Sequence, residues 1–241
     1  MIERLNINNF GINTITFPDT GRAELLWQQF TKEQQRQMAK VYQQAFGGEP
    51  WYEKYTCNVC RIFTAEFGEC PNCGRQLEEA YPTEWLITEY FPKMLSDYVP
   101  GVLLVVQNQR DEIVGFSNGG FNSIGLLVAN KYPQNPEQIL ASMTKQFGLS
   151  AEDQVFYDNE TCLLPQNQRS GLGKQLSQKR LQAALDLRAK LICGRTINLP
   201  WLELKKQQLT NKGFLFESDV LKGDTYQVDN VSRRFYLATK S

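Results

Sequence analysis

The stretch "LLPQNQRSGLGKQL", residues 163–176, has the composition of a loop that holds phosphate. The apolar run "VFYDNETCLL" (155–164) precedes it as a predicted strand, and a helical pattern over 171–189 follows it. Glycines between a strand and a helix let backbone N–H groups at the helix N-terminus bind an anion. The stretch therefore predicts a phosphate-binding loop, and a glycine-bearing turn that only starts a helix is the alternative.

Spacing separates the kinds of phosphate loop. In a Walker template anchored on Gly173-Lys174, the first glycine position holds Gln168 and the hydroxyl position holds Gln175, so both fixed positions fail. In the dinucleotide template G-x-G-x-x-G, counted from Gly171, the third glycine position holds Leu176. Nucleoside triphosphate hydrolysis and dinucleotide binding are both disfavoured.

A third template fits at each fixed position. The pattern [QR]-x-x-G-x-[GA] is met by the run 168–173, "QRSGLG", with Pro165 three residues upstream of it. This run resembles the pyrophosphate loop of the GNAT acetyltransferases. The segment "DEIVGF" (111–116) resembles the third strand of that family, and "NLPWLELKKQQLTNKGF" (198–214) resembles its asparagine–helix segment after the fifth strand. The resemblance covers about residues 84–237, with 20–50 as a plausible first strand–helix portion.

The resemblance implies a mixed α/β chain with the GNAT fold. In that fold a central, mostly antiparallel twisted sheet is flanked by helices, and its fourth and fifth strands splay apart. The acyltransferase domain would comprise 1–55 and 76–241. Acetyl-CoA would be the co-substrate and would lie in the gap between the two strands. The residues expected by motif position to contact it are Cys162, Leu163 and Leu164 through their backbone, the loop residues Gln168, Arg169, Ser170, Gly171, Leu172, Gly173 and Lys174, and Asn198.

The family's chemistry is direct attack of a primary amine on the thioester, which needs a base. Glu160 lies where the family often has an acidic strand residue, and Asp158, two residues earlier, is expected on the same strand face. Two neighbouring carboxylates can raise one pKa towards neutrality, although solvated strand-end charges are the alternative. Leu209 occupies the position of the family's usual acid tyrosine, which is a departure from the pattern. Cys162 and Cys193 lie in apolar strand patterns that predict buried thiols.

The segment "CNVCRIFTAEFGECPNCG" holds two C-x-x-C pairs, Cys57 with Cys60 and Cys70 with Cys73. Four thiolates in this spacing predict a closed tetrahedral zinc site, one ion per chain, in a zinc ribbon inserted at 56–75. Disulfides are the alternative and are disfavoured by an expected cytoplasmic location. A closed site cannot activate water, so its role would be structural: the ribbon would shape the acceptor side or dock a protein partner.

Composition excludes several classes of function. The chain has 26 basic and 26 acidic residues and no histidine, which disfavours nucleic-acid binding and excludes histidine-dependent catalysis. No window approaches eighteen apolar residues, and neither a signal peptide nor a membrane span is expected. The acceptor would be a small-molecule or peptide amine, and the chain a monomer or homodimer. The alternative function is a non-catalytic acyl-CoA-binding sensor or scaffold that uses the ribbon to dock proteins.

The remaining periodicity predicts the other elements. A strand is expected at 12–17, one helix or two over 20–46 with Thr31 and Gln34 as a capping box, and a helical region over 83–99 broken at Pro92. Further strands are expected at 101–107, 112–121, 191–197, 214–221 and 232–239, and helices at 136–147 and 202–214. In the helix over 171–189 the basic residues are expected on the solvent face. The segment "EPWYE" (49–53) would bind a cation or form a packed loop.

Overall fold

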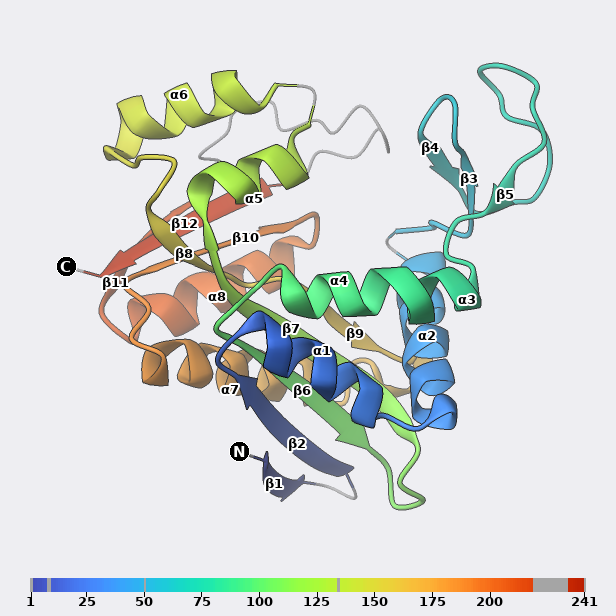
Figure 1. Cartoon of the computed structure of the whole chain (residues 1–241), viewed down its shortest axis with the longest axis horizontal. Coiled ribbons are helices and arrows are strands. Elements are labelled where there is room, and N and C mark those ends of the chain that lie inside the picture. Colours follow the sequence, from blue (N-terminus) through green and yellow to red (C-terminus); the bar gives the residue numbers. More distant parts are fainter. Residues whose placement is uncertain (1, 8–9, 50, 134, 219–233, 241) are drawn as a thin grey trace.

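The computed structural model of the chain describes residues 2–7, 10–49, 51–133, 135–218 and 234–240 (Figure 1). Its strands are β1 (Ile2–Ile7), β2 (Phe10–Phe17), β3 (Tyr55–Cys57), β4 (Ile62–Thr64), β5 (Glu78–Glu79), β6 (Gly101–Gln107), β7 (Ile113–Ser123), β8 (Gln154–Tyr157), β9 (Thr161–Leu163), β10 (Leu191–Thr196), β11 (Phe214–Ser218) and β12 (Arg234–Lys240). Its helices are α1 (Thr20–Gln29), α2 (Lys32–Gly47), α3 (Thr83–Trp85), α4 (Phe91–Ser96), α5 (Ile124–Lys131), α6 (Pro136–Phe147), α7 (Leu172–Asp186) and α8 (Leu199–Thr210).

One sheet organises the chain, with strand order β1-β2-β6-β7-β8-β10-β12-β11 and β9 also paired with β7. Every pairing in it is antiparallel except that of β8 with β10, which is parallel. This confirms the predicted mixed α/β class with a central, mostly antiparallel sheet. Among the described residues, no helix combines the length and hydropathy needed to cross a bilayer.

Helices cover both faces of the sheet, and two neighbouring residues of β7 identify the faces. The Phe116 ring packs edge-on against Phe91 of α4 with 5.6 Å between ring centroids. The adjacent Ser117 hydroxyl accepts a hydrogen bond from Arg180 of α7. Because successive strand residues point to opposite faces, α4 and α7 lie on opposite sides of the sheet. Figure 1 shows α1, α2 and α4 on the first face and α7 and α8 on the second.

Local signals explain most element boundaries. The region 20–46 divides into α1 and α2, and Thr31 forms the predicted reciprocal capping box with Gln34. The predicted break at Pro92 is wrong. The chain stays helical there because a π-helical turn, Leu86–Tyr90, leads directly into α4, and the carbonyl of Ile87, one turn before the proline, accepts a hydrogen bond from Trp27 Nε1 instead. The predicted strand ends 219–221 and 232–233 lie outside the described residues.

The strand predicted over 155–164 is interrupted, and this interruption shapes the site. Gly120 pairs with Tyr157 in β8, while Ser117 pairs with Thr161 in β9. Two residues of β7, 118–119, therefore lie opposite three, 158–160, which is a β-bulge. The extra residue reverses the alternation of side chains along the rest of the strand. A period-2 pattern in the sequence cannot reveal such an insertion.

The cysteine-bearing segment forms a separate three-stranded sheet, β4-β3-β5, that stands away from the main body beside α2 and α3 (Figure 1). Its strands run from Tyr55 to Glu79, slightly beyond the predicted insertion. Hydrogen bonds from Lys54 N to Thr64 O and from Ala80 N to Lys54 O close its base. Of its side chains, Cys57, Cys70 and Leu77 are buried together, so the segment has very little apolar core of its own.

Candidate active site and metal centre

The main sheet is forked after β8. Strand β8 pairs with β7 on one side and with β10 on the other, through Phe156 with Ile192 and Tyr157 with Cys193. Beyond the bulge, β9 continues along β7, and no pairing between β9 and β10 occurs in the described parts of the chain. A cavity of about 850 Å³ opens at this fork and reaches from the loop after β9 to the end of α2. The predicted splaying of the fourth strand, here β8 and β9, from the fifth, here β10, is therefore present.

The glycine-bearing loop lies at one end of this cavity. Gly171 is the N-cap of α7 with a φ of +85°, a conformation that favours glycine, and no atom lies within 4 Å of where its Cβ would be. The side chain of Gln168 donates to Leu163 O at 3.3 Å, and Ser170 Oγ donates to Asn167 O at 2.6 Å. The first N–H groups of α7 have no partner within the helix, so the loop and helix start offer donors to an anion.

The loop side chains differ in their surroundings. Gln168, Arg169, Gly171, Gly173 and Lys174 line the cavity, whereas Leu172 is buried in the core. On the opposite wall, Asn198 is the N-cap of α8. Its side-chain oxygen accepts from Trp201 N at 3.0 Å, which leaves its amide group for a ligand.

The backbone of β9 alternates between its partner strand and the fork. Leu164 N donates to Val114 O, and Asn118 N donates to Glu160 O, so residues 160, 162 and 164 turn their backbone groups towards β7. By the alternation of an antiparallel pair, Thr161 and Leu163 direct theirs into the fork. Of the three backbone contacts predicted, Leu163 is therefore placed to meet a ligand, while Cys162 and Leu164 are engaged with the sheet.

Glu160 lies in the wall of the cavity, half-buried under two tyrosines. Tyr90 Oη donates to Glu160 Oε1 at 2.5 Å, Tyr42 Oη lies 3.5 Å from the same oxygen, and the two hydroxyls are 3.1 Å apart. Burial, followed by the charge of Glu160, raises the pKa of both tyrosines well above the ordinary value. Both phenols are therefore neutral donors around neutral pH and hold the carboxylate in one orientation.

Asp158 lies on the opposite face from Glu160 because of the bulge, so the expectation of a shared strand face is wrong. Its carboxylate is buried and forms ion pairs with Arg180 of α7 and with Lys205 Nζ, at 2.5 Å, of α8. Tyr236 of β12 donates a hydrogen bond to it. Burial alone would raise the pKa of Asp158, but the Arg180 guanidinium and the Lys205 ammonium outweigh burial and lower it. A carboxylate held in this way is a poor base.

The buried cluster of Asp158, Arg180, Lys205 and Tyr236 was not predicted from the sequence. The basic residues of 171–189 were expected on the solvent face. Arg180 is 1% exposed and also donates to Ser117 Oγ, Asn118 O and Glu160 O at 2.6–2.9 Å. Arg180 therefore stabilises the bulge from the face of the sheet that α7 covers. The one available signal was spacing: Arg180 lies four residues after Leu176 and three before Ala183, on the apolar face of the helix.

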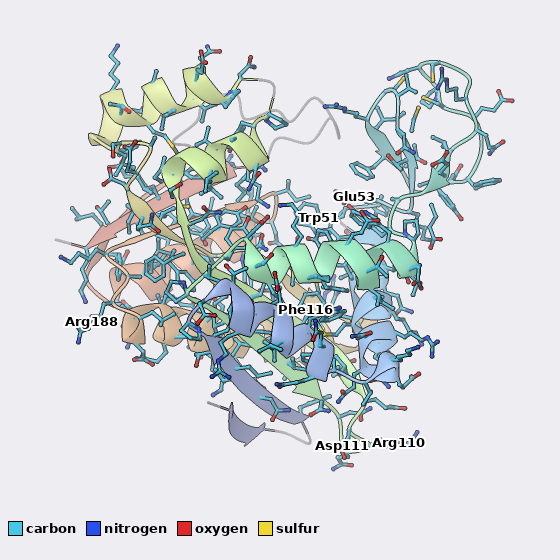
Figure 2. All side chains as sticks on the ribbon, viewed as in Figure 1. Trp51, Glu53, Arg110, Asp111, Phe116 and Arg188 are labelled. Atoms are coloured by element: carbon cyan, nitrogen blue, oxygen red, sulfur yellow. The ribbon has the colours of Figure 1, made fainter. Side chains whose placement is uncertain are left out.

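The far end of the cavity is formed by the last turn of α2 and the segment after it. Phe46 and Trp51, 5.4 Å apart between ring centroids, line it together with Glu49. Glu53 is buried and accepts a hydrogen bond from Tyr81, which makes "EPWYE" a packed loop at this residue. Figure 2 shows Trp51 and Glu53 together at the root of the cysteine-bearing sheet. Lys131 and Arg195 add positive charge to the same cavity.

The four predicted ligand cysteines are brought together. Their sulfur atoms all lie within 4.8 Å of one another, and the Sγ atoms of Cys57 and Cys73 are 3.6 Å apart. Tetrahedral zinc with Zn–S bonds of about 2.3 Å requires sulfurs separated by about 3.8 Å. The residues after the two pairs, Arg61 and Gly74, have φ of +53° and +71°, so the two knuckles have matching turns. The donor set and its spacing fit a closed tetrahedral ion.

Three further predicted positions are buried. Leu209 has no polar group and is 2% exposed, so it supplies no acid at the family's tyrosine position. Burial raises the pKa of the Cys162 and Cys193 thiols well above the ordinary value. Neither thiol is therefore a candidate nucleophile.

Comparison with known proteins gives structural neighbours only. No family model and no curated protein matches the sequence. Among solved structures, the chain is similar to a mosquito arylalkylamine N-acetyltransferase-like protein, at 11% identity and a TM-score of 0.47, over 93% of this chain and 98% of that one. It is also similar to a Drosophila melanogaster polyamine N-acetyltransferase, at 14% identity and a TM-score of 0.44, over 94% of this chain and 99% of that one. A Desulfovibrio desulfuricans protein assigned to the GNAT acetyltransferases is similar at 10% identity and a TM-score of 0.45, over 94% of this chain and 96% of that one.

Proposed function

We propose that this protein is an acetyl-CoA-dependent N-acetyltransferase that acts on a primary amine of a small molecule or peptide. The observation that carries the proposal is the forked sheet, whose cavity has the glycine loop and the start of α7 at one end and the carboxylate of Glu160 beside the bulge. A volume of about 850 Å³ is within the range of sites that hold a cofactor-sized ligand.

The coenzyme would be held mainly by backbone groups. Its pyrophosphate would accept hydrogen bonds from the loop 168–174 and the start of α7, where the helix dipole also favours negative charge. The pantetheine arm would pair with the fork-facing backbone groups of Thr161 and Leu163 and with the Asn198 amide. The cavity-lining side chains of Arg169 and Lys174 supply positive charge for the phosphates.

Glu160 is the base in this proposal. It takes a proton from the acceptor ammonium, directly or through a water molecule, and the neutral amine attacks the thioester carbonyl. The C–N bond forms, the nitrogen gives its second proton to water, the C–S bond breaks, and the electron pair of that bond leaves on the coenzyme sulfur, which then needs a proton. Asp158 has no base role here, because its two cationic partners hold it as a carboxylate on the other face.

Zinc would be bound by Cys57, Cys60, Cys70 and Cys73, one ion per chain, with a structural role. Four thiolates saturate a tetrahedral ion and leave no position for water or substrate. The small buried core of the segment supports this role, since a sheet this short needs metal coordination to hold its shape.

Calorimetry with acetyl-CoA and CoA, followed by thiol release over a panel of primary amines, tests the function. The expected result is coenzyme binding and amine-dependent thiol release. Binding without release on any amine would instead support the non-catalytic sensor or scaffold, and no binding would overturn both. The buried Leu209 at the acid position is the observation that keeps the sensor as a second candidate.

A further inference from the structure

We propose that Tyr236 donates the proton to the coenzyme sulfur as the thioester breaks, and that Lys205 resupplies this proton through Asp158. The inference rests on the proposed acetyl transfer. Tyr236, on β12, would take the acid role that a tyrosine at position 209, on α8, would have in the family pattern.

The Tyr236 side chain reaches the bulge, beside which the cavity opens. Tyr236 pairs with Gly194 in the neighbouring strand, and a Cβ on that glycine would lie 2.5 Å from the hydroxyl oxygen. The glycine thus lets the phenol cross β10 and reach Asp158 on the bulge. Tyr236 lines the cavity together with Asp158 and Thr161, whose backbone faces the fork. A thioester held between β9 and β10 would have its sulfur next to this end of the fork.

A second proton lies directly behind the tyrosine. Lys205 Nζ and Tyr236 Oη both contact the same carboxylate oxygen, Asp158 Oδ2, and the lysine contact measures 2.5 Å. Arg180 holds the other oxygen, Oδ1. A buried ammonium, a shared carboxylate oxygen and a phenol are therefore arranged in sequence from α8 to the cavity.

The surroundings of the cluster keep a proton on both Tyr236 and Lys205 at neutral pH. Burial, followed by the charge of Asp158, raises the pKa of Tyr236 well above the ordinary value, so the phenol is protonated at neutral pH. Burial lowers the pKa of Lys205, Asp158 opposes this and Arg180 adds to it, and the resulting pKa is about 8. A lysine of this kind gives up its proton far more readily than an exposed one, near pKa 10.4. The Arg180 guanidinium on Oδ1 leaves Oδ2 as the carboxylate oxygen that the lysine and the tyrosine share.

The transfer balances. When the C–S bond breaks, its electron pair goes to sulfur, and the Tyr236 O–H, turned from Asp158 Oδ2 to the sulfur, gives its proton to form the thiol. The phenolate then takes a proton through Asp158 Oδ2 from Lys205, which becomes a neutral amine. Solvent restores the ammonium between turnovers. No oxidant, reductant or metal is needed.

The test compares wild-type protein with Tyr236→Phe and Lys205→Arg, using acetyl-CoA and an amine that the wild type accepts. We expect kcat to fall about 100-fold in Tyr236→Phe, with unchanged coenzyme affinity, in a protein that still folds and has a lower melting temperature. Lys205→Arg keeps the charge beside Asp158 but cannot release a proton, so kcat should fall. The alkaline limb of the wild-type kcat profile, near pH 8, should be absent in this variant. Tyr98→Phe, another buried tyrosine, outside this cluster, is the matched control.

A donor with a better leaving group separates chemistry from structure. p-Nitrophenyl acetate releases a phenolate that needs no proton, so wild type and Tyr236→Phe should use it at equal rates. A purely structural role would reduce both reactions together. If both variants turn over acetyl-CoA at the wild-type rate, the proton route is wrong and the acetyltransferase function still holds. If the wild type itself shows no turnover, the proposed function and the proton route are both wrong.

Discussion

Tyr90 Oη lies 2.5 Å from Glu160 Oε1, and this hydrogen bond joins the π-helical turn before α4 to the bulge between β8 and β9. The carboxylate that faces the cavity is therefore oriented by an element other than the strand region that carries it. Tyr42 of α2 supports the same oxygen from 3.5 Å. Removing either the carboxylate or its orienting hydroxyl should affect proton removal from the acceptor.

We expect Glu160→Gln to lower kcat about 100-fold at neutral pH, because an amide cannot accept the ammonium proton. Tyr90→Phe should lower it less, since the carboxylate stays and only its orientation is lost. Steady-state kinetics with saturating acetyl-CoA measures both. Glu89→Gln, the neighbouring acid of the same turn, is the control and should leave kcat unchanged. A fully active Glu160→Gln would contradict the base assignment.

Coenzyme binding should depend on the glycine loop. We expect Gly171→Glu with Gly173→Glu to abolish binding of CoA in calorimetry, because carboxylates would occupy the anion site and Gly171 has a left-handed φ of +85°. Zinc content should remain one ion per chain. Gly148→Glu is the control for backbone strain. Gly148 also has a positive φ, +67°, and no atom near the position of a Cβ, but it caps α6 outside the cavity. Binding retained by the double variant would contradict the loop assignment.

The buried charge cluster should contribute strongly to stability. Asp158→Asn leaves Arg180 and Lys205 buried without their counter-charge, and we expect a loss of about 3–5 kcal/mol at pH 7. Asp97→Asn, which breaks an exposed pair with Lys93, should cost under about 1 kcal/mol. Urea unfolding measures both changes.

The same cluster predicts the sign of a pH effect. The folded-state pKa of Asp158 is lowered, so its stabilising contribution is present above the unfolded pKa, near 3.9, and is lost as pH falls further. The difference between wild type and Asp158→Asn should therefore shrink as pH falls below about 4. A difference that keeps growing below pH 4 would contradict the assignment of Asp158 as an ionised partner.

The sequence predicts local features of the site better than its long-range contacts. The glycine loop, the capping box at Thr31 and the two cysteine knuckles are each set within a few residues, where turn geometry and capping act. The bulge at 158–160 depends on register with β7, and the Asp158 cluster joins elements up to 78 residues apart. A charged residue on an apolar helix face, such as Arg180, is informative only once its buried partner is known.

Zinc removal should affect the acceptor more than the coenzyme, because a continuous set of contacts runs from the metal site to Glu160. Lys54 N donates to Thr64 O and Lys54 O accepts from Ala80 N, which fixes the root of the cysteine-bearing sheet. Next to this root, Tyr81 donates to buried Glu53, and its ring packs edge-on against Tyr42 at 5.0 Å. Tyr42 in turn lies beside Glu160.

We therefore expect Cys57→Ser with Cys70→Ser to lose the metal and raise the acceptor KM at least about tenfold, while the dissociation constant for CoA changes less than twofold. Metal analysis, calorimetry and kinetics on the same preparation measure all three. Cys193→Ala, which removes a buried thiol outside the cluster, should keep one ion per chain. Equal losses of acceptor and coenzyme affinity would contradict this route, because the glycine loop lies at the other end of the cavity and shares none of these contacts.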